Sequence, residues 1–354
     1  MKPDSDLIAL QKRLLARMAH NSRSLPITRI MEVCGTHTMA IGRFGLRRVL
    51  PDNIRLISGP GCPVCVTPAG YIDQAIAIAR KHGLTLAAFG DLLRVPGRTG
   101  SLETARAEGV GVEIILSPSD LFRLKKPLLF LATGFETTLA PIASVIQETV
   151  QRKEQNIFFL TSFKIVPPTL HLLLNDPEIG IDAFLLPGHV SAIIGEAAYG
   201  VLPVPSVIAG FECLSILLAL DKIVSMKQDG LTGVANTYRQ AVTRNGNRVA
   251  QKLIAEMLEP CDEPWRGIGP LPGCSLQLRP AYHSVDAVRV FSLPPLENEN
   301  TPGCCCGDIL KGKIRPFDCP LFAKSCTPDS PVGPCMVSSE GTCAAFYKYE
   351  RTAP

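Results

Sequence analysis

Short apolar segments alternate with longer segments of helical periodicity along most of this sequence. This alternation is typical of a parallel β-sheet whose strands are joined by helices, so it predicts the α/β class. The expected strands are residues 29–33, 55–57, 85–89, 113–116, 128–131, 157–160, 183–186 and 206–209. The expected helices are residues 71–81, 102–108, 141–151, 191–199, 213–226 and 233–259.

Composition excludes several classes of protein. The 354 residues are too many for one ordinary core, and hydrophobic residues at 46% with charged residues at 19% argue against disorder. A net charge of +4 without a dense basic run predicts neither a nucleic-acid partner nor a membrane-surface partner. No apolar stretch reaches the roughly 18 residues of a membrane span, so we expect a cytoplasmic protein.

The chain divides into four expected regions. Residues 1–28 carry an amphipathic helix expected to pack on the body, and it is unlike the core of a signal peptide. ATGFETTLAPIA at 132–143 resembles IAGFECLSILLA at 208–219, each a strand end, a GFE turn and a helix start. We therefore expect two similar doubly wound parallel-sheet units around a cleft, at 29–131 and 132–259. Proline and glycine become frequent after that, so 260–354 is expected to be a loop-rich, cysteine-rich module that needs a metal.

Thirteen cysteines occur in a chain with no recognisable export signal. In a reducing compartment such cysteines favour metal binding or thiol redox chemistry over structural disulfides. Cys213 and Cys261 stand alone and are interpreted as small buried hydrophobic residues. The grouping of the other cysteines needs another explanation.

Four expected strands end in polar or cysteine-bearing turns. Ligands in doubly wound sheets bind beyond the carboxyl ends of the strands, so these turns are expected to converge on one cleft. The four sequences are VCGTHT at 33–38, SGPGCPVC at 58–65, TGFETT at 133–138 and LPGHVS at 186–191.

The first two turns carry the early thiols. Cys34 and His37 lie three residues apart, so one turn can present a soft metal ligand and a proton-handling group, although a lone histidine at a strand end more often makes local hydrogen bonds. Cys62 and Cys65 form a CxxC pair that suits redox chemistry or open metal coordination, with a structural zinc knuckle as the alternative. The basic residues near this motif are interpreted as part of a solvent-exposed helix face, and contact with an acidic partner is the alternative. They are Arg43, Arg47 and Arg48.

Glu136 and His189 sit in tight glycine-containing turns. A helix N-terminal carboxylate or a capping contact explains each of them without a catalytic role. The alternative is that both face the shared cleft, and Pro187 and Gly188 fix the backbone where His189 points.

The C-terminal cysteines Cys319, Cys326, Cys335 and Cys343 have spacings of C-x6-C-x8-C-x7-C. Four thiolates in one short segment suit either zinc or an iron–sulfur cluster. The compact CxxC arms of a zinc ribbon are absent here, which favours [4Fe–4S]. The sequence GCCCG at 303–307 precedes this group. Its cysteines are interpreted either as a dithiol relay beside the cluster or as spare thiols without a role.

Long cysteine-bearing blocks in this order closely resemble the HypD family of hydrogenase maturation factors. The matching blocks cover essentially the whole chain: MEVCGTHTMAI, GPGCPVCVTP, TGFETTLAP, LPGHVSAIIG and CPLFAKSCTPDSPVGPCMVSSEGTCAAFYKY. GCCCGDIL resembles the family's GCxCG stretch with one extra cysteine, Cys305.

The resemblance implies a scaffold on which iron(II) acquires two cyanides and one carbon monoxide before transfer to the large subunit of a [NiFe] hydrogenase. It implies a HypC-type small chaperone and a HypE-type cyanide donor as partners. Cys34 is then the iron-binding thiolate, Cys62 and Cys65 are auxiliary metal or redox thiols, and the four late cysteines hold a [4Fe–4S] cluster.

Two other functions remain open at the level of sequence. One is a thiol–disulfide oxidoreductase fed by the iron–sulfur cluster, with Cys62 and Cys65 as its active pair. The other is a zinc-stapled enzyme that uses Glu136 and His189 as acid and base.

Overall fold

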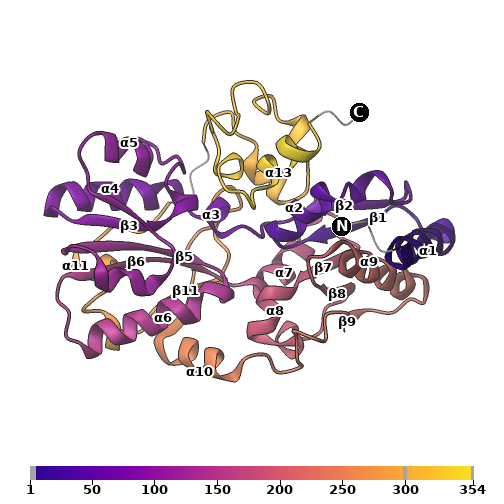
Figure 1. Cartoon of the computed structure of the whole chain (residues 1–354), viewed down its shortest axis with the longest axis horizontal. Coiled ribbons are helices and arrows are strands. Elements are labelled where there is room, and N and C mark those ends of the chain that lie inside the picture. The colour runs from indigo at the N-terminus through magenta and orange to yellow at the C-terminus, as the bar shows by residue number, and fades with distance from the viewer. Residues whose placement is uncertain (1–4, 298–300, 352–354) are drawn as a thin grey trace.

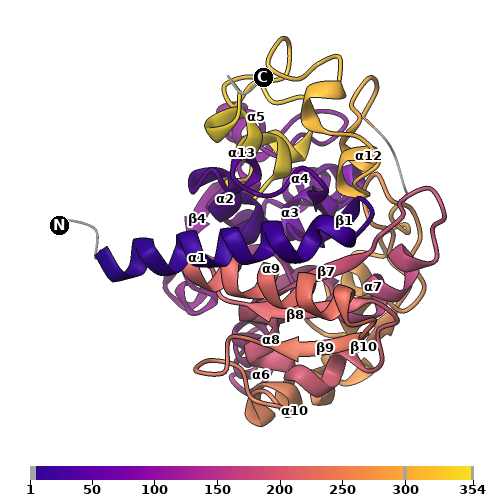
Figure 2. The same cartoon turned by 90° about the vertical axis from the view of Figure 1, so that its right-hand side faces the viewer.

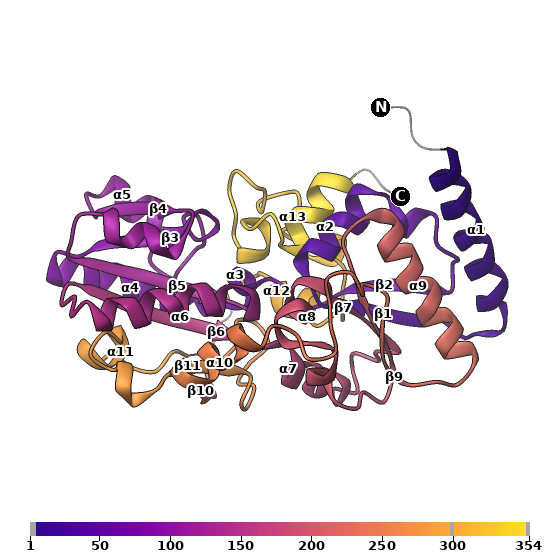
Figure 3. The ribbon, with the colours of Figure 1, turned by 60° about the horizontal axis from the view of Figure 1, so that its bottom comes forward.

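Two α/β lobes lie side by side along the long axis of the molecule, and the C-terminal segment lies against the region where they meet (Figure 1). This architecture comes from a computed structural model that describes residues 5–297 and 301–351. Figure 3 shows the same arrangement from below, with the C-terminal segment between the lobes. No helix among the described residues is long and apolar enough to cross a membrane.

The first sheet is entirely parallel, with strand order β2-β1-β7-β8-β9. Its central strands β7 and β8 are buried at every position, as expected for a sheet covered on both faces. The bounds are β1 Thr28–Glu32, β2 Ile54–Ser58, β7 Ala183–Pro187, β8 Pro205–Ala209 and β9 Gly233–Asn236.

The second sheet is mixed, with strand order β10-β11-β6-β5-β3-β4. Strands β4, β3, β5 and β6 run parallel, whereas β11 is antiparallel to β6 and β10 is antiparallel to β11. The bounds are β3 Thr85–Phe89, β4 Val112–Ile115, β5 Leu128–Gly134, β6 Ile157–Lys164, β10 Leu258–Cys261 and β11 Ser275–Leu278.

The eight expected strands are all present, but the expected units do not coincide with the sheets. The first sheet joins β1 and β2 to β7, β8 and β9, so it combines parts of 29–131 and 132–259. The second sheet likewise combines β3 and β4 with β6. Strand partners are chosen by long-range burial, which apolar periodicity along the chain does not encode.

The helices cover the sheets and connect their strands. Figure 2 shows α1 and α9 lying along each other over the first sheet, where Leu14 and Met18 share a core cluster with Ile216 and Leu220. The bounds are α1 Ser5–Asn21, α2 Gly35–Arg43, α3 Pro63–Val66, α4 Ala69–His82, α5 Leu102–Ala107, α6 Glu136–Gln151, α7 Val166–Leu174, α8 Gly188–Ile194, α9 Cys213–Gln228, α10 Arg248–Met257, α11 Ala287–Val290, α12 Cys306–Leu310 and α13 Thr342–Tyr349.

The single helix expected over 233–259 is wrong. Residues 233–236 form β9, and α10 begins only after Asn247, whose side chain accepts hydrogen bonds from the backbone of Val249 and Ala250. Gly246 has a φ of +65°, a left-handed conformation that a helix interior does not contain. A glycine and a capping asparagine therefore place the helix start within the expected span.

The two GFE turns do form the same local unit. In one, β5 leads through Phe135 into α6, and in the other, β8 leads through Phe211 into α9. The two units belong to different sheets, so the sequence echo reports a shared strand–turn–helix connection.

The expected boundary at 259/260 is also displaced. Strands β10 and β11 extend the second sheet, with Leu258 opposite Leu278, so residues 258–278 belong to that lobe. Short helices and turns follow β11, in the described parts of residues 279–351.

Candidate metal and thiol site

Cys34 lies where β1 turns into α2, as the residue that precedes the first turn of the helix. It is half-buried. Burial and the nearby Glu340 carboxylate raise the pKa of the Cys34 thiol to about 11. Backbone N–H groups of Thr36 and His37 face the sulfur and act in the opposite direction. The Cys34 thiol is therefore protonated at pH 7, and a metal that binds its sulfur must displace this proton.

Glycines allow three chain segments to meet around Cys34. The backbone N–H of Gly35 donates to the carbonyl of Gly61 at 3.1 Å. A Cβ atom on Gly61 would lie 2.4 Å from Cα of Cys34, and one on Gly35 would lie 2.3 Å from the carbonyl oxygen of Glu340. Only glycine permits these approaches, so the CGTH loop, the GPGC loop and the C-terminal segment are held together.

Glu340 is a site residue that the sequence analysis did not find. Its Oε1 accepts a hydrogen bond from the Thr36 hydroxyl at 2.5 Å, although more than three hundred positions separate the two residues. A single glutamate in an irregular loop has no distinguishing pattern, and only the fold brings it beside Cys34.

His37 and His189 both lie against Phe211, another residue that the sequence analysis did not select. The ring centroid of Phe211 is 4.6 Å from that of His37 and 4.1 Å from that of His189. Phe211 belongs to the second GFE turn. The similarity of this turn to the one at residues 134–136 was the sequence feature that could have drawn attention to Phe211. Two of the four expected turns are thus joined through the ring of Phe211.

The two histidines differ in environment. His37 is fully buried, its Nε2 is 3.0 Å from the carbonyl oxygen of Gly210, and burial lowers its pKa to about 4. Its Nδ1 has no partner among the described residues. His189 is exposed, and desolvation lowers its pKa while the Glu340 carboxylate opposes that shift. His37 is therefore a neutral group at pH 7, held beside the Cys34 turn.

Glu136 is the first residue of α6 and is buried. Its Oε1 accepts a hydrogen bond from the backbone N–H of Val166 at 2.8 Å, and burial raises its pKa to about 7. The hydroxyl of Tyr199 interacts electrostatically with both Glu136 and Cys34. Tyr199 is therefore within electrostatic range of both the TGFETT turn and the Cys34 turn, and the first of these carries an acid with a pKa near neutral pH.

Cys62 and Cys65 lie beside the C-terminal cysteines. Cys62 precedes α3, and its sulfur accepts from the backbone N–H of Cys65 at 3.3 Å. Both residues are buried, and burial raises the pKa of the Cys65 thiol. The Cys65 thiol also interacts with that of Cys335. The CxxC pair thus connects directly to the late cysteines.

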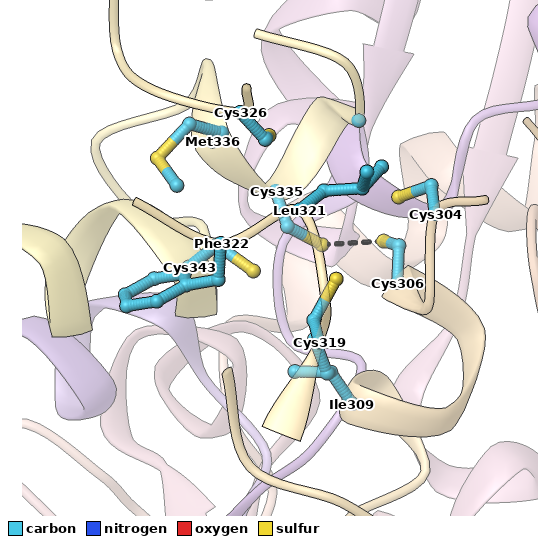
Figure 4. A pocket seen from close by; sticks show the side chains of 11 residues that line it. Cys304, Cys306, Ile309, Cys319, Leu321, Phe322, Cys326, Cys335, Met336 and Cys343 are labelled. Atoms are coloured by element: carbon cyan, nitrogen blue, oxygen red, sulfur yellow. Dashed lines mark hydrogen bonds between the residues drawn. The ribbon is translucent and has the colours of Figure 1, made fainter. Parts of the chain in front are cut away.

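Six cysteine side chains line one apolar pocket (Figure 4). It contains the four late cysteines of the sequence analysis and also Cys304 and Cys306 from the GCCCG stretch. The figure shows the side chains of Cys306, Cys319, Cys335 and Cys343 pointing into a common interior. Ile309, Leu321, Phe322, Gly333 and Met336 complete the lining.

The sulfurs in this pocket are not equivalent. Sγ of Cys306 is 2.6 Å from Sγ of Cys335, and Cys306 also interacts with Cys304. A line of interacting thiols therefore runs from Cys62 through Cys65, Cys335 and Cys306 to Cys304. Cys305 instead interacts with Cys319.

The pocket fits an iron–sulfur cluster by its donors, which are soft thiols in an apolar surrounding. No set of three or more His, Cys, Asp or Glu side chains in the described parts of the chain surrounds a single metal-ion position. A polynuclear cluster is larger than one ion and needs its four thiolates spread around a wider space. The six cysteines that line the pocket include the four donors that such a cluster would need.

The remaining cysteines lie outside the pocket. Cys213 and Cys261 are half-buried, and Cys274, which the sequence analysis did not discuss, is buried. Burial raises the pKa of all three thiols.

The fold and the site define a class of α/β protein in which a cysteine-lined pocket adjoins a half-buried cysteine turn between two sheets. A family model named HypD and described as "Hydrogenase formation hypA family" matches residues 9–350. The chain belongs to this family.

Three relatives show how far the similarity extends. Hydrogenase maturation factor HypD of Escherichia coli K12 is 43% identical, over 91% of this chain and 89% of the relative. Hydrogenase expression/formation protein HupD of Azotobacter chroococcum is 42% identical, over 97% and 95%. Hydrogenase maturation factor HypD of Cupriavidus necator is 39% identical, also over 97% and 95%.

Proposed function

We propose that this chain is a hydrogenase maturation factor that acts in the cytoplasm as a scaffold for an iron centre. Iron(II) is bound through Cys34, receives two cyanides and one carbon monoxide, and passes to the large subunit of a [NiFe] hydrogenase. A HypC-type chaperone and a HypE-type cyanide donor act with the chain. The family membership and the names of the relatives support the hydrogenase role.

The observation that carries the proposal is the setting of Cys34. Its sulfur is half-buried, is faced by two backbone N–H groups and has a carboxylate nearby. Only one protein thiolate is present in this turn, so a bound iron keeps positions open for cyanide and carbon monoxide. Open positions are what a scaffold needs, because the finished centre must leave.

The buried residues His37 and Glu136 also have roles in the proposal. His37 is neutral at pH 7 and has an unpartnered Nδ1 among the described residues, so it can exchange a hydrogen bond with a ligand on the iron. Glu136 titrates near pH 7, which suits a group that takes up or releases a proton during ligand delivery.

We propose that the cysteine pocket holds a [4Fe–4S] cluster through Cys304, Cys319, Cys326 and Cys343. This set differs from the four late cysteines at one position, because the sulfur of Cys335 is already engaged with those of Cys306 and Cys65. When bound, such a cluster supplies one-electron chemistry. Cys335 and Cys306 then form a dithiol beside it.

The line of thiols also supports a second function, a cluster-dependent thiol–disulfide oxidoreductase. Oxidation of the Cys62–Cys65 dithiol to a disulfide releases two electrons and two protons, and Cys335 lies next to Cys65 to exchange with it. In the scaffold proposal the same pair serves as a redox auxiliary of the iron site.

Two substitutions test whether Cys34 holds the iron and whether the C-terminal cysteines hold the cluster. Cys34→Ala is expected to abolish the infrared bands of cyanide and carbon monoxide and to leave the brown chromophore intact. Cys326→Ala is expected to bleach the chromophore. Both variants are purified without oxygen together with the partner proteins. Full band intensity in Cys34→Ala would show that another residue holds the iron, and a brown protein without bands in the wild type would favour the oxidoreductase.

A further inference from the structure

Arg266 is a buried cation in the loop between β10 and β11. Only 3% of its surface is exposed. Its Nη1 donates to the carbonyl oxygen of Pro96 at 3.0 Å, and its Nη2 donates to the hydroxyl of Thr301 at 2.8 Å. Both acceptors are neutral.

The guanidinium has no carboxylate partner among residues 5–297 and 301–351, since none of their ion pairs includes Arg266. Burying a charge in a protein carries an effective penalty of several kcal/mol unless an opposite charge compensates it. Arginine stays protonated under these conditions. An anion is therefore expected beside this side chain.

Four cysteine sulfurs act electrostatically on Arg266. Burial lowers the pKa of Arg266, and the opposing influences come from Cys306, Cys304, Cys335 and Cys65. These four residues belong to the pocket and to the CxxC pair. In the proposed function Cys304 binds the cluster as a thiolate, so the loaded site places an anion near Arg266.

The backbone around Arg266 joins the same two segments. Its own N–H donates to the carbonyl oxygen of Val66, next to Cys65, at 2.7 Å. A Cβ atom on Gly307, next to Cys306, would lie 2.1 Å from the carbonyl oxygen of Gly267. The loop is thus packed between the CxxC turn and the GCCCG stretch.

We propose that Arg266 is a positioning residue that supplies the positive charge facing the anionic sulfur site and joins the CxxC turn to the GCCCG stretch. The inference rests on the proposed function, in which thiolates of this pocket hold an iron–sulfur cluster. A fixed cation next to the site favours the form with one more electron, because that form carries more negative charge.

The test compares three variants of the full chain. Arg266→Gln removes the charge and keeps a hydrogen-bond donor, whereas Arg266→Lys keeps the charge and loses the planar fork. Arg29→Gln is the matched control, because the guanidinium of Arg29 also donates to a backbone carbonyl of the C-terminal segment, that of Gly312, at 2.8 Å. Among the described residues, the Arg29 guanidinium has no hydrogen bond to any of the four cysteines that act on Arg266.

The measurement is the reduction midpoint of the brown chromophore in the purified chain, followed by its absorbance in an anaerobic redox titration. At the wild-type midpoint, Arg266→Gln is expected to lower the ratio of reduced to oxidised forms by roughly tenfold, or about 59 mV for a one-electron couple. Arg266→Lys is expected to shift it by much less, and Arg29→Gln is expected to leave it unchanged. An unchanged midpoint in Arg266→Gln, or equal shifts in the Lys and Gln variants, would overturn the proposal.

If Arg266→Gln does not retain the chromophore, the iron content of the variants tests whether the charge at position 266 is required. We then expect Arg266→Lys to bind iron and Arg266→Gln to bind none, with similar circular dichroism spectra for the two iron-free chains. Equal loss of iron in both variants would contradict the role of charge. A colourless wild-type chain would instead count against the proposed function, so the two failures are distinguishable.

Discussion

The carboxyl group of Glu136 is buried and accepts a hydrogen bond from the backbone N–H of Val166. Its Oε2 has no partner among the described residues, and burial raises its pKa from 4.5 to about 7. The folded protein therefore holds this proton more tightly than the unfolded chain does. The stability associated with the protonated form is fully present below about pH 4.5 and is lost as the pH rises through about 7.

Replacing Glu136 with glutamine should remove this pH dependence, because glutamine still accepts from Val166 and does not ionise. Relative to the wild type, we expect Glu136→Gln to gain roughly 3 kcal/mol of unfolding free energy between pH 4.5 and a pH above 7. Urea unfolding across this range measures the difference. Glu148→Gln, at a partly exposed position of the same helix, is the control and should show no such trend. Parallel curves for wild type and Glu136→Gln would refute the shift.

The contact between Cys306 and Cys335 leads us to predict that Cys304, and not Cys335, is a ligand of the proposed cluster. Cys304→Ser should lose most of the bound iron, because Cys304 is one of the four proposed donors. Cys335→Ser should keep the iron and the chromophore, since its thiol is engaged with Cys306 at 2.6 Å. Iron analysis and visible absorbance measure both outcomes. The reverse pattern would restore Cys335 as a ligand, as the sequence spacing suggested.

At the residue scale, sequence motifs identified the cysteines but not what surrounds them. Cys34, Cys62 and Cys65 stand out because glycine, proline and spacing mark their loops. Glu340, Phe211 and Arg266 have no such marker, and each acquires its role only through contacts with distant parts of the chain.

At the scale of elements, the helix pair α2 and α13 links the Cys34 turn to the C-terminal segment. Arg47, just after α2, donates to Glu32 at the end of β1 and to Glu350 beyond α13, the latter at 2.6 Å. Its guanidinium also lies 4.6 Å from the ring centroid of Phe346. Arg47 is therefore an internal ion-pair residue, which corrects its interpretation as part of a solvated helix face.

Removing this link should destabilise the protein and loosen its C-terminal segment. Arg47→Met leaves the fully buried Glu32 without its cation, and breaking a buried pair in this way costs about 3–5 kcal/mol. Urea unfolding measures the loss, and limited proteolysis should cut the C-terminal segment faster. Arg48→Met, at the exposed neighbouring position, should behave as wild type. Wild-type stability in Arg47→Met would show that the ion pair contributes little.

The regular elements were largely predictable because their signals are local. Each expected strand is an apolar run, and the GFE echo correctly marked two strand–turn–helix connections. The expected helix at 233–259 was wrong, because its apolar periodicity continued across a strand, a positive-φ glycine and a helix cap. Helix α7 was not among the expected helices; it begins at Val166, and its two prolines stand in the first turn, where proline is tolerated.

At the scale of the whole molecule, the order of the strands along the chain does not indicate which sheet each strand joins. The chain passes from the first sheet to the second after β2, returns after β6 and leaves again after β9. This route places the turns after β1, β2, β5 and β7 near the junction that the C-terminal segment also reaches. The convergence expected from the strand-end rule arises between two sheets whose membership no single motif reveals.

The central claim is that this molecule builds an iron centre carrying cyanide and carbon monoxide. Its most direct test is the infrared spectrum of the wild-type chain purified without oxygen together with its partner proteins. The account predicts cyanide and carbonyl stretching bands on this complex, with the cyanide bands shifting when the cyanide precursor is labelled with carbon-13. A brown, fully folded complex that lacks these bands would contradict it.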